Sequence, residues 1–174
     1  MVPARTGATA LAGLTALTVA GCSSGPGPVA IGAPLTTGAV SAEVAAECAE
    51  LVAALPDEVD PGVERREVTG GSERFAAWGD PAVVLECGVV RPDREEPPAI
   101  VNGVAWTVRD VGAGFRWTTR DLVVNLAVDV PDAYPNGAEL VNPLAAPITG
   151  TLELAPDAPP PGSAVPGAPL PSPS

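Results

Sequence analysis

The stretch WGDPAVVLECGVV, residues 78–90, constrains the fold more than any other part of the chain. Within it, residues 82–90 form the longest apolar run outside the N-terminal segment, and only Glu86 and Gly88 interrupt that run. A valine-rich run of this length that follows a Gly-Asp-Pro turn is typical of a buried strand. We therefore expect a central strand here, with the rest of the domain packed around it.

A helix is predicted over residues 41–55, upstream of this strand. Ser41 suits the N-cap, and Glu43 falls in the first turn, where the helix dipole favours a negative charge. Pro56 ends the helix. Its apolar residues recur at helical spacing and form one stripe: Val44, Cys48, Leu51, Val52 and Leu55. We expect this stripe, including its cysteine, to face the core.

The N-terminal segment has the form of an export signal. Residues 1–21 carry one arginine, no acidic residue and an apolar stretch that is short for a membrane-spanning helix. They end in Val-Ala-Gly before Cys22, which resembles the lipobox of bacterial lipoproteins. That resemblance implies that Cys22 receives a diacylglyceryl group and becomes the first mature residue, anchored to a membrane. The alternative is an ordinary secretory peptide that contains a cysteine. Residues 22–40, rich in Gly, Pro, Ser and Thr, are predicted to be a flexible tether.

The other two cysteines are expected to pair. If Cys22 is lipidated, Cys48 and Cys87 are the two that remain, in an oxidising compartment where disulfides persist. The alternatives are two free buried thiols or a redox pair. Redox pairs usually have CxxC spacing, which is absent here, so a structural disulfide is favoured.

The remainder of the domain reads mostly as strands. A short edge strand is predicted over residues 63–68, a hairpin over 100–120 in which Trp106 and Trp117 can pair, and an alternating strand over 122–130. Residues 136–148 can form a short helix, and the Pro-rich residues 155–174 read as a disordered tail. The sequence thus predicts a single α+β domain over residues 41–154. It would have a small, mostly antiparallel sheet of four to five strands, with one or two helices packed on one face and one disulfide.

Composition narrows the range of functions. The chain has no histidine and no lysine, and its net charge is −12, which disfavours binding to nucleic acid. The absence of histidine removes the commonest general base and metal ligand. Acidic residues at 57, 58 and 60 lack the spacing of a calcium-binding loop and are read as a solvated turn. We expect no metal, no cofactor and no catalytic residue.

Several strings together resemble a known family. They are the lipobox, the cysteine-bearing helix ending in LVAALP, and the strings AAWGDPAVVLECGV, VNGVAW and TTRDLVVNLAVDVP. Over about residues 45–150 they resemble the actinobacterial lipoprotein family catalogued as domain of unknown function 3515. The resemblance implies an envelope location and a Cys48–Cys87 pair. It transfers no catalytic residue, because the family has none assigned.

The candidate ligand-binding residues are aromatic or basic. Trp78, Trp106, Trp117 and Arg120 would suit a sugar, a lipid or a peptide if they shared a concave surface. The alternative is that the tryptophans pack in the core and the arginine pairs with Asp80 or Asp121. Asp110 and Asp121 flank the hairpin and are a weak candidate for a paired acid and base.

These observations favour a non-catalytic lipoprotein on the outer face of the cell membrane. It would act as a binding or scaffold module for an envelope protein or a cell-wall component. One alternative is a carrier of a small lipid, glycan or peptide, with a pocket under the tryptophan hairpin. A further alternative is a hydrolase that uses carboxylates.

Overall fold

The computed structural model of the chain describes residue 1 and residues 26–35, 39–71 and 73–160. The predicted signal peptide beyond Met1, the predicted lipidation site Cys22 and the Pro-rich tail from residue 161 lie outside the described residues. The strands are β1 (Val29–Ala30), β2 (Arg65–Arg66), β3 (Val68–Thr69), β4 (Phe75–Trp78), β5 (Val83–Val89), β6 (Ala99–Val101), β7 (Val104–Asp110), β8 (Gly114–Thr119) and β9 (Asn125–Pro131). The helices are α1 (Ala42–Ala54), α2 (Gly137–Val141), the 3-10 helix η1 (Asn142–Leu144) and α3 (Ala145–Thr151).

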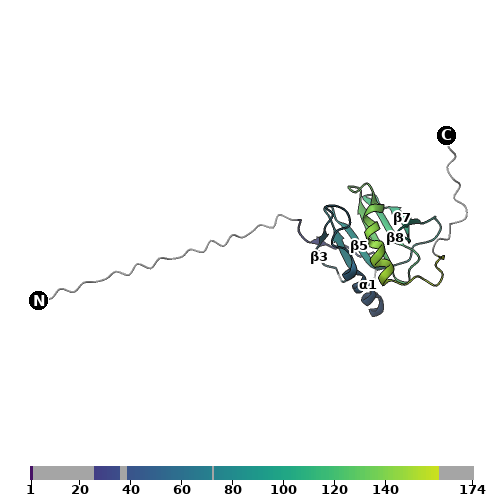
Figure 1. The fold of residues 1–174 in the computed structure, drawn as a ribbon, viewed down its shortest axis with the longest axis horizontal. Helices are drawn as coiled ribbons and strands as arrows, with labels where there is room; N and C mark the ends of the chain where they lie inside the picture. Colours follow the sequence, from purple (N-terminus) through teal and green to yellow (C-terminus); the bar gives the residue numbers. More distant parts are fainter. Residues whose placement is uncertain (2–25, 36–38, 72, 161–174) are drawn as a thin grey trace, which may run out of the picture.

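The predicted α+β architecture is confirmed. One antiparallel sheet has the strand order β2-β4-β5-β9-β8-β7-β6, and β1 pairs separately with β3 in parallel. Helices α1 and α3 contact each other and lie over the same face of the sheet, where α1 contacts β5 and α3 contacts β7 (Figure 1). We call the opposite face, which the helices leave uncovered, the outer face.

The predicted number of four to five strands is too low, because the sheet has seven. Residues 100–110 were expected to be one strand, yet Asn102 and Gly103 both have positive φ, at 45° and 84°, and form a tight turn between β6 and β7. An Asn-Gly pair is the preferred sequence for such a hairpin turn. The second addition is β4, a fully buried four-residue strand that pairs with β5. Its run is too short to show a period.

The predicted central strand is β5, an interior strand beside β9. Its alternate residues Val83, Leu85 and Cys87 are buried under the helices, and their cross-strand neighbours on β9 include Val128 and Leu126. On the next hairpin, the rings of Trp106 and Trp117 lie 6.3 Å apart in an edge-to-face arrangement, which confirms the predicted tryptophan contact. The core therefore lies between the inner face of the sheet and the helices.

Helix α1 begins where the sequence predicts. The side chain of Ser41 accepts a hydrogen bond from the backbone N–H of Val44, as an N-cap residue does. The other end is held by Arg65 of β2, whose guanidinium donates to the carbonyls of Val52 and Leu55 at 2.8 and 3.0 Å. The same guanidinium lies over the ring of Trp78, 5.8 Å from its centre. One arginine thus joins the helix terminus to the sheet edge.

The predicted disulfide is present between Cys48 and Cys87. Both residues are fully buried, and the bond joins α1 to β5 across 39 residues of sequence. Apart from the backbone itself, it is the single covalent cross-link between the helical layer and the sheet within the described residues.

Residues on both sides of the predicted domain, 41–154, also make backbone hydrogen bonds to it. At the N-terminal end, part of the predicted tether forms β1, where the N–H of Val29 donates to Glu67 and that of Ile31 to Thr69. At the C-terminal end, the N–H of Ala155 donates to the carbonyl of Asp121, and Ala155 is buried. Both ends of the domain therefore pack against the sheet.

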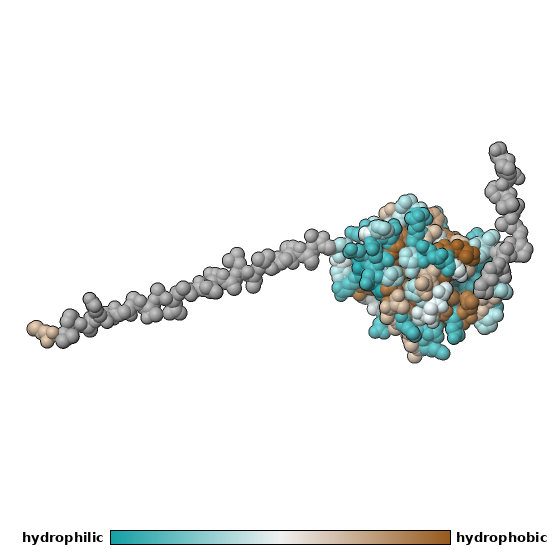
Figure 2. Space-filling model, in the orientation of Figure 1, coloured by the Kyte–Doolittle hydropathy of each residue, from teal (hydrophilic) through white to brown (hydrophobic). Residues whose placement is uncertain are grey.

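The surface is mixed in polarity. Figure 2 shows hydrophobic patches scattered among larger hydrophilic areas on one side of the molecule. The exposed large apolar residues of the domain are Leu35, Val90, Ile100, Val111, Phe115, Val123 and Leu154. None of the helices described is long and apolar enough to cross a membrane.

We expect the disulfide to be a major source of stability. Closing a loop of about 40 residues lowers the entropy of the unfolded chain enough to stabilise the fold by about 4 kcal/mol. Urea unfolding of the Cys48→Ser/Cys87→Ser variant should therefore show a loss of that order, while Cys22→Ser, which removes the third cysteine, should leave the midpoint unchanged. Equal midpoints for all three proteins would contradict this prediction.

Candidate functional site

The two faces of the sheet differ in chemistry. The inner face is apolar, whereas the outer face carries Glu86 on β5, Asp129 on β9 and Arg116 on β8. Arg116 is the direct cross-strand neighbour of Asp129, and Glu86 lies opposite Ala127, two residues before Asp129. Because side chains alternate along a strand, these three charged groups project from the same face. They form a group of charged side chains on adjacent strands of the outer face.

A strap crosses this face. We use that name for residues 29–35, which include β1 and end at Leu35. The N–H of Leu35 donates to Oε2 of Glu86 at 2.7 Å, so the strap reaches from the β3 edge to the middle of the sheet. Only Val29 and Ile31 are partly buried among its residues, and the other five are exposed. The strap is therefore held largely by backbone hydrogen bonds.

Between the strap and the sheet lies a cavity of about 220 Å³. We call it the outer cavity. One wall is the strap and the other is the outer face of β4, β5, β8 and β9. Its lining residues are Ala30, Ile31, Gly32, Ala33, Leu35, Phe75, Val84, Glu86, Arg116, Ala127 and Asp129. Several of these side chains are small, among them Ala33 on the strap and Ala127 on the sheet.

Glu86 is a buried carboxylate, with only 4% of its surface exposed. Besides the amide of Leu35, it lies 3.7 Å from Nη2 of Arg74, which is also buried. Arg74 in turn donates to the carbonyl of Cys87 at 2.7 Å and lies over the ring of Phe75. A charge removed from water is tolerated only with such partners. Glu86 therefore ties the strap to the sheet electrostatically.

Arg116 and Asp129 form a two-pronged ion pair. Nε and Nη2 of the arginine donate to the two carboxylate oxygens at 2.7 and 2.9 Å. These hydrogen bonds, with the fields of Asp129 and Glu86, raise the pKa of the Arg116 guanidinium against the opposing effect of burial. The pair is partly exposed, with 31% and 41% of the two side chains accessible, so it can meet a ligand from solvent.

The predicted tryptophan site is not on this face. Trp78, Trp106 and Trp117 are buried in the core under the helices, and Nε1 of Trp78 donates to the carbonyl of Pro56 at 2.9 Å. They belong to the inner side of the sheet, opposite the outer cavity. The structure therefore brings two of the tryptophans together as core residues, as in the alternative drawn from the sequence.

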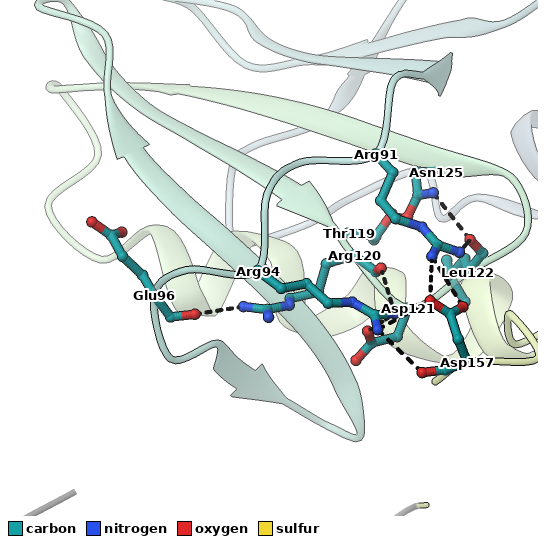
Figure 3. Close-up of polar contacts among 9 residues, drawn as sticks. All are labelled: Arg91, Arg94, Glu96, Thr119, Arg120, Asp121, Leu122, Asn125 and Asp157. Atoms are coloured by element: carbon teal, nitrogen blue, oxygen red, sulfur yellow. Dashed lines mark hydrogen bonds and ion pairs between the residues drawn. The ribbon is translucent and has the colours of Figure 1, made fainter. Parts of the chain in front are cut away.

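Arg120 is buried and holds a loop of the domain through a hydrogen bond. It is 7% exposed, and its Nη1 donates to the carbonyl of Glu96 at 2.7 Å, which holds the loop after β5 (Figure 3). Two arginines of that loop hold the C-terminal segment: Arg91 donates to both carboxylate oxygens of Asp157 at 3.0 Å, and Arg94 donates to the carbonyl of Asp157 at 3.1 Å. Arg94 also lies 2.8 Å from the carboxylate of Asp121. Arg120 thus belongs to a cluster that closes the domain.

The other acidic candidates do not line the outer cavity. Asp110 accepts a hydrogen bond from Gly112 in the β7–β8 turn, whereas Asp121 follows the other end of β8, so the hairpin separates this pair. Glu58 accepts from the N–H of Gly62 within the turn after α1. Within the part of the chain that the structure describes, no group of three or more metal-binding side chains occurs.

The family assignment rests on the length of the match. A family model described as protein of unknown function (DUF3515) matches residues 6–156, which is most of the chain. The chain belongs to the DUF3515 family. This match confirms the resemblance seen in the sequence. No curated protein and no solved structure matches the chain at a significant level.

Sequence reasoning missed the outer cavity of this DUF3515 domain. The sequence feature that points to this cavity is Glu86, the one charged residue within the apolar run of the interior strand. Arg116 and Asp129 also stood at outward positions of predicted strands. Their meeting depends on the β8–β9 register, and the strap that covers them comes from a segment read as a tether. No local pattern predicts either contact.

We expect Glu86 to control the strap. In Glu86→Ala, the amide of Leu35 loses its acceptor and the buried Arg74 loses its carboxylate, which should cost on the order of 3 kcal/mol of stability. Hydrogen exchange at the Leu35 amide should accelerate strongly. Glu86→Gln keeps an acceptor of the same shape and should show a smaller acceleration. If the Leu35 amide exchanges at the same rate in all three proteins, Glu86 does not hold the strap.

A second prediction concerns pH. The hydrogen bonds from Arg91 lower the pKa of Asp157 against the opposing effect of burial, and a backbone hydrogen bond and the charges of Arg91 and Arg94 lower it further. A depressed pKa means that the contact is fully formed above the ordinary pKa of an aspartate and is lost as pH falls through the lower, folded-state value. An NMR titration should find the Asp157 pKa below the usual aspartate range, and Arg91→Gln should raise it.

Proposed function

We propose that this DUF3515 protein is a lipid-anchored, extracytoplasmic protein of the cell membrane. Within the envelope it would act as a non-catalytic binding module, with the outer cavity as its binding site. The observation that carries the proposal is the arrangement of cysteines. Cys48 and Cys87 form a buried disulfide, as expected of an exported protein, and the third cysteine directly follows an apolar segment ending in Val-Ala-Gly.

The position of the strap supports a link between anchor and site. Val29, the first residue of the strap, is seven positions after Cys22. A fully extended chain of that length spans at most about 25 Å. An acylated Cys22 would therefore keep the outer cavity near the membrane surface, where partners in the envelope are met.

The size of the cavity favours a small group over a whole lipid or glycan. Pockets that enclose a drug-sized ligand usually have volumes of about 300–1,000 Å³. The outer cavity, with about 220 Å³, is smaller than that range and opens beside an exposed strap. This comparison supports recognition of part of a larger partner rather than transport of an enclosed molecule.

The hydrolase alternative would have to use Glu86 and Asp129, the two carboxylates of the cavity. Asp129 is engaged by Arg116 through both oxygens, and Glu86 accepts from a backbone amide. Carboxylates held in this way are poorly placed to exchange protons with a substrate. We therefore propose binding without catalysis.

Anchoring is tested by the mass of the N-terminal peptide. Wild-type protein from membranes should begin at residue 22 and carry acyl chains, and two chains give stable retention. Cys22→Ser should lack the modification and appear in the soluble exported fraction. Ser23→Ala, which changes the adjacent residue, should behave as wild type. An unmodified Cys22 in the wild-type protein would overturn the anchor.

A further inference from the structure

We propose that the outer cavity binds a primary ammonium group carried on a short alkyl chain, with Asp129 receiving the ammonium. The inference rests on the proposed function, because it names the ligand class of the same site. It follows from three properties of the cavity: its accessible carboxylate Asp129, its apolar walls and its dimensions.

The charge of the whole chain favours a cation. Within the cavity each carboxylate has one basic partner: Arg74 lies 3.7 Å from Glu86, and Arg116 is paired with Asp129. The chain as a whole has a net charge of −12. That charge repels an anionic ligand and attracts a cation to the accessible carboxylate of Asp129.

Asp129 is the carboxylate that can take the new hydrogen bonds. Each of its oxygens accepts one bond from Arg116, and an ionised carboxylate has about four acceptor positions. Its side chain is 41% accessible, so a ligand reaches it without displacing the core. Arg116 holds the carboxylate in one orientation, which reduces the ordering required on binding.

The rest of the lining suits an alkyl chain. Phe75, Val84 and Ala127 form an apolar floor on the sheet, and Ile31 and Ala33 of the strap form the roof. A volume of about 220 Å³ equals that of about seven water molecules at the density of the liquid. An amine with five carbons has six non-hydrogen atoms and matches this space. A charged head at Asp129 and an apolar stem beside Phe75 would both be satisfied.

The probe is n-pentylamine, which is protonated at neutral pH, added to the full-length exported chain. Its binding is followed by shifts of the NMR signals of Leu35, Ala127 and Asp129. We expect a dissociation constant on the order of 1 mM. The neutral isostere 1-pentanol should bind about tenfold more weakly, and pentanoate weaker still, because a charge-assisted hydrogen bond is lost or reversed. Raising the salt concentration should weaken amine binding.

Two variants locate the site, each with a matched control. Asp129→Asn keeps the shape of the side chain and should weaken amine binding about tenfold, whereas Asp132→Asn, an exposed aspartate outside the lining, should not. Ala33→Leu narrows the cavity from the strap without altering the sheet and should also weaken binding. Ala39→Leu, outside the lining, is its control. The strap variant keeps the test valid if Asp129→Asn fails to fold.

A lysine peptide and the free amine, compared as probes, distinguish the two possible sources of the ammonium group. Acetyl-Ala-Lys-Ala-amide presents the same group on a peptide, and tighter binding than n-pentylamine would assign the site to a polypeptide partner. Tighter binding of the free amine would assign it to a small molecule. Equal affinity for the amine and 1-pentanol, or no shift at about ten times the expected dissociation constant, overturns the proposal. That outcome would leave lipidation of Cys22 untouched, because the two tests share no measurement.

Discussion

The disulfide between Cys48 and Cys87 is the constraint from which both faces of the domain follow. It fixes α1 against the inner face of β5 and sets which residues of that strand point inward. Because side chains alternate along a strand, an inward Cys87 requires an outward Glu86. The same bond that holds the core together therefore determines the position of the buried carboxylate in the outer cavity.

The orientation of Glu86 is also what makes the strap part of the fold. A carboxylate that is 4% exposed needs donors, and one of them is the backbone amide of Leu35. The strap has few buried side chains of its own, so this hydrogen bond and the short pairing of β1 with β3 account for much of its attachment. The cavity then arises from a mismatch, since the small residues of the strap do not fill the space over the sheet.

The features that sequence predicted well are those with a local cause. The helix over residues 42–54 has a capping serine and a clear apolar stripe, and β5 and β9 have long apolar or alternating runs. The missed features depend on geometry that no window of sequence contains. β4 is too short to show a period. The β6–β7 turn is the exception, because its Asn-Gly pair is a local signal for a hairpin turn. The candidate tryptophans were interpreted by residue type, whereas burial places them in the core.

The cavity residues show why a site of this kind is hard to read from one sequence. Glu86, Arg116 and Asp129 come from three different strands and lie far apart in the sequence. The sheet order β5-β9-β8 brings these residues together, although β6 and β7 lie between β5 and β8 in the sequence. A charged residue at an outward strand position normally indicates a solvated face. Here the strap covers that face, and a segment with the composition of a linker turns a solvated row of charges into a partly enclosed site. The site therefore exists because the strap covers those charges. It depends on the residues that follow Cys22 and not on the strands alone.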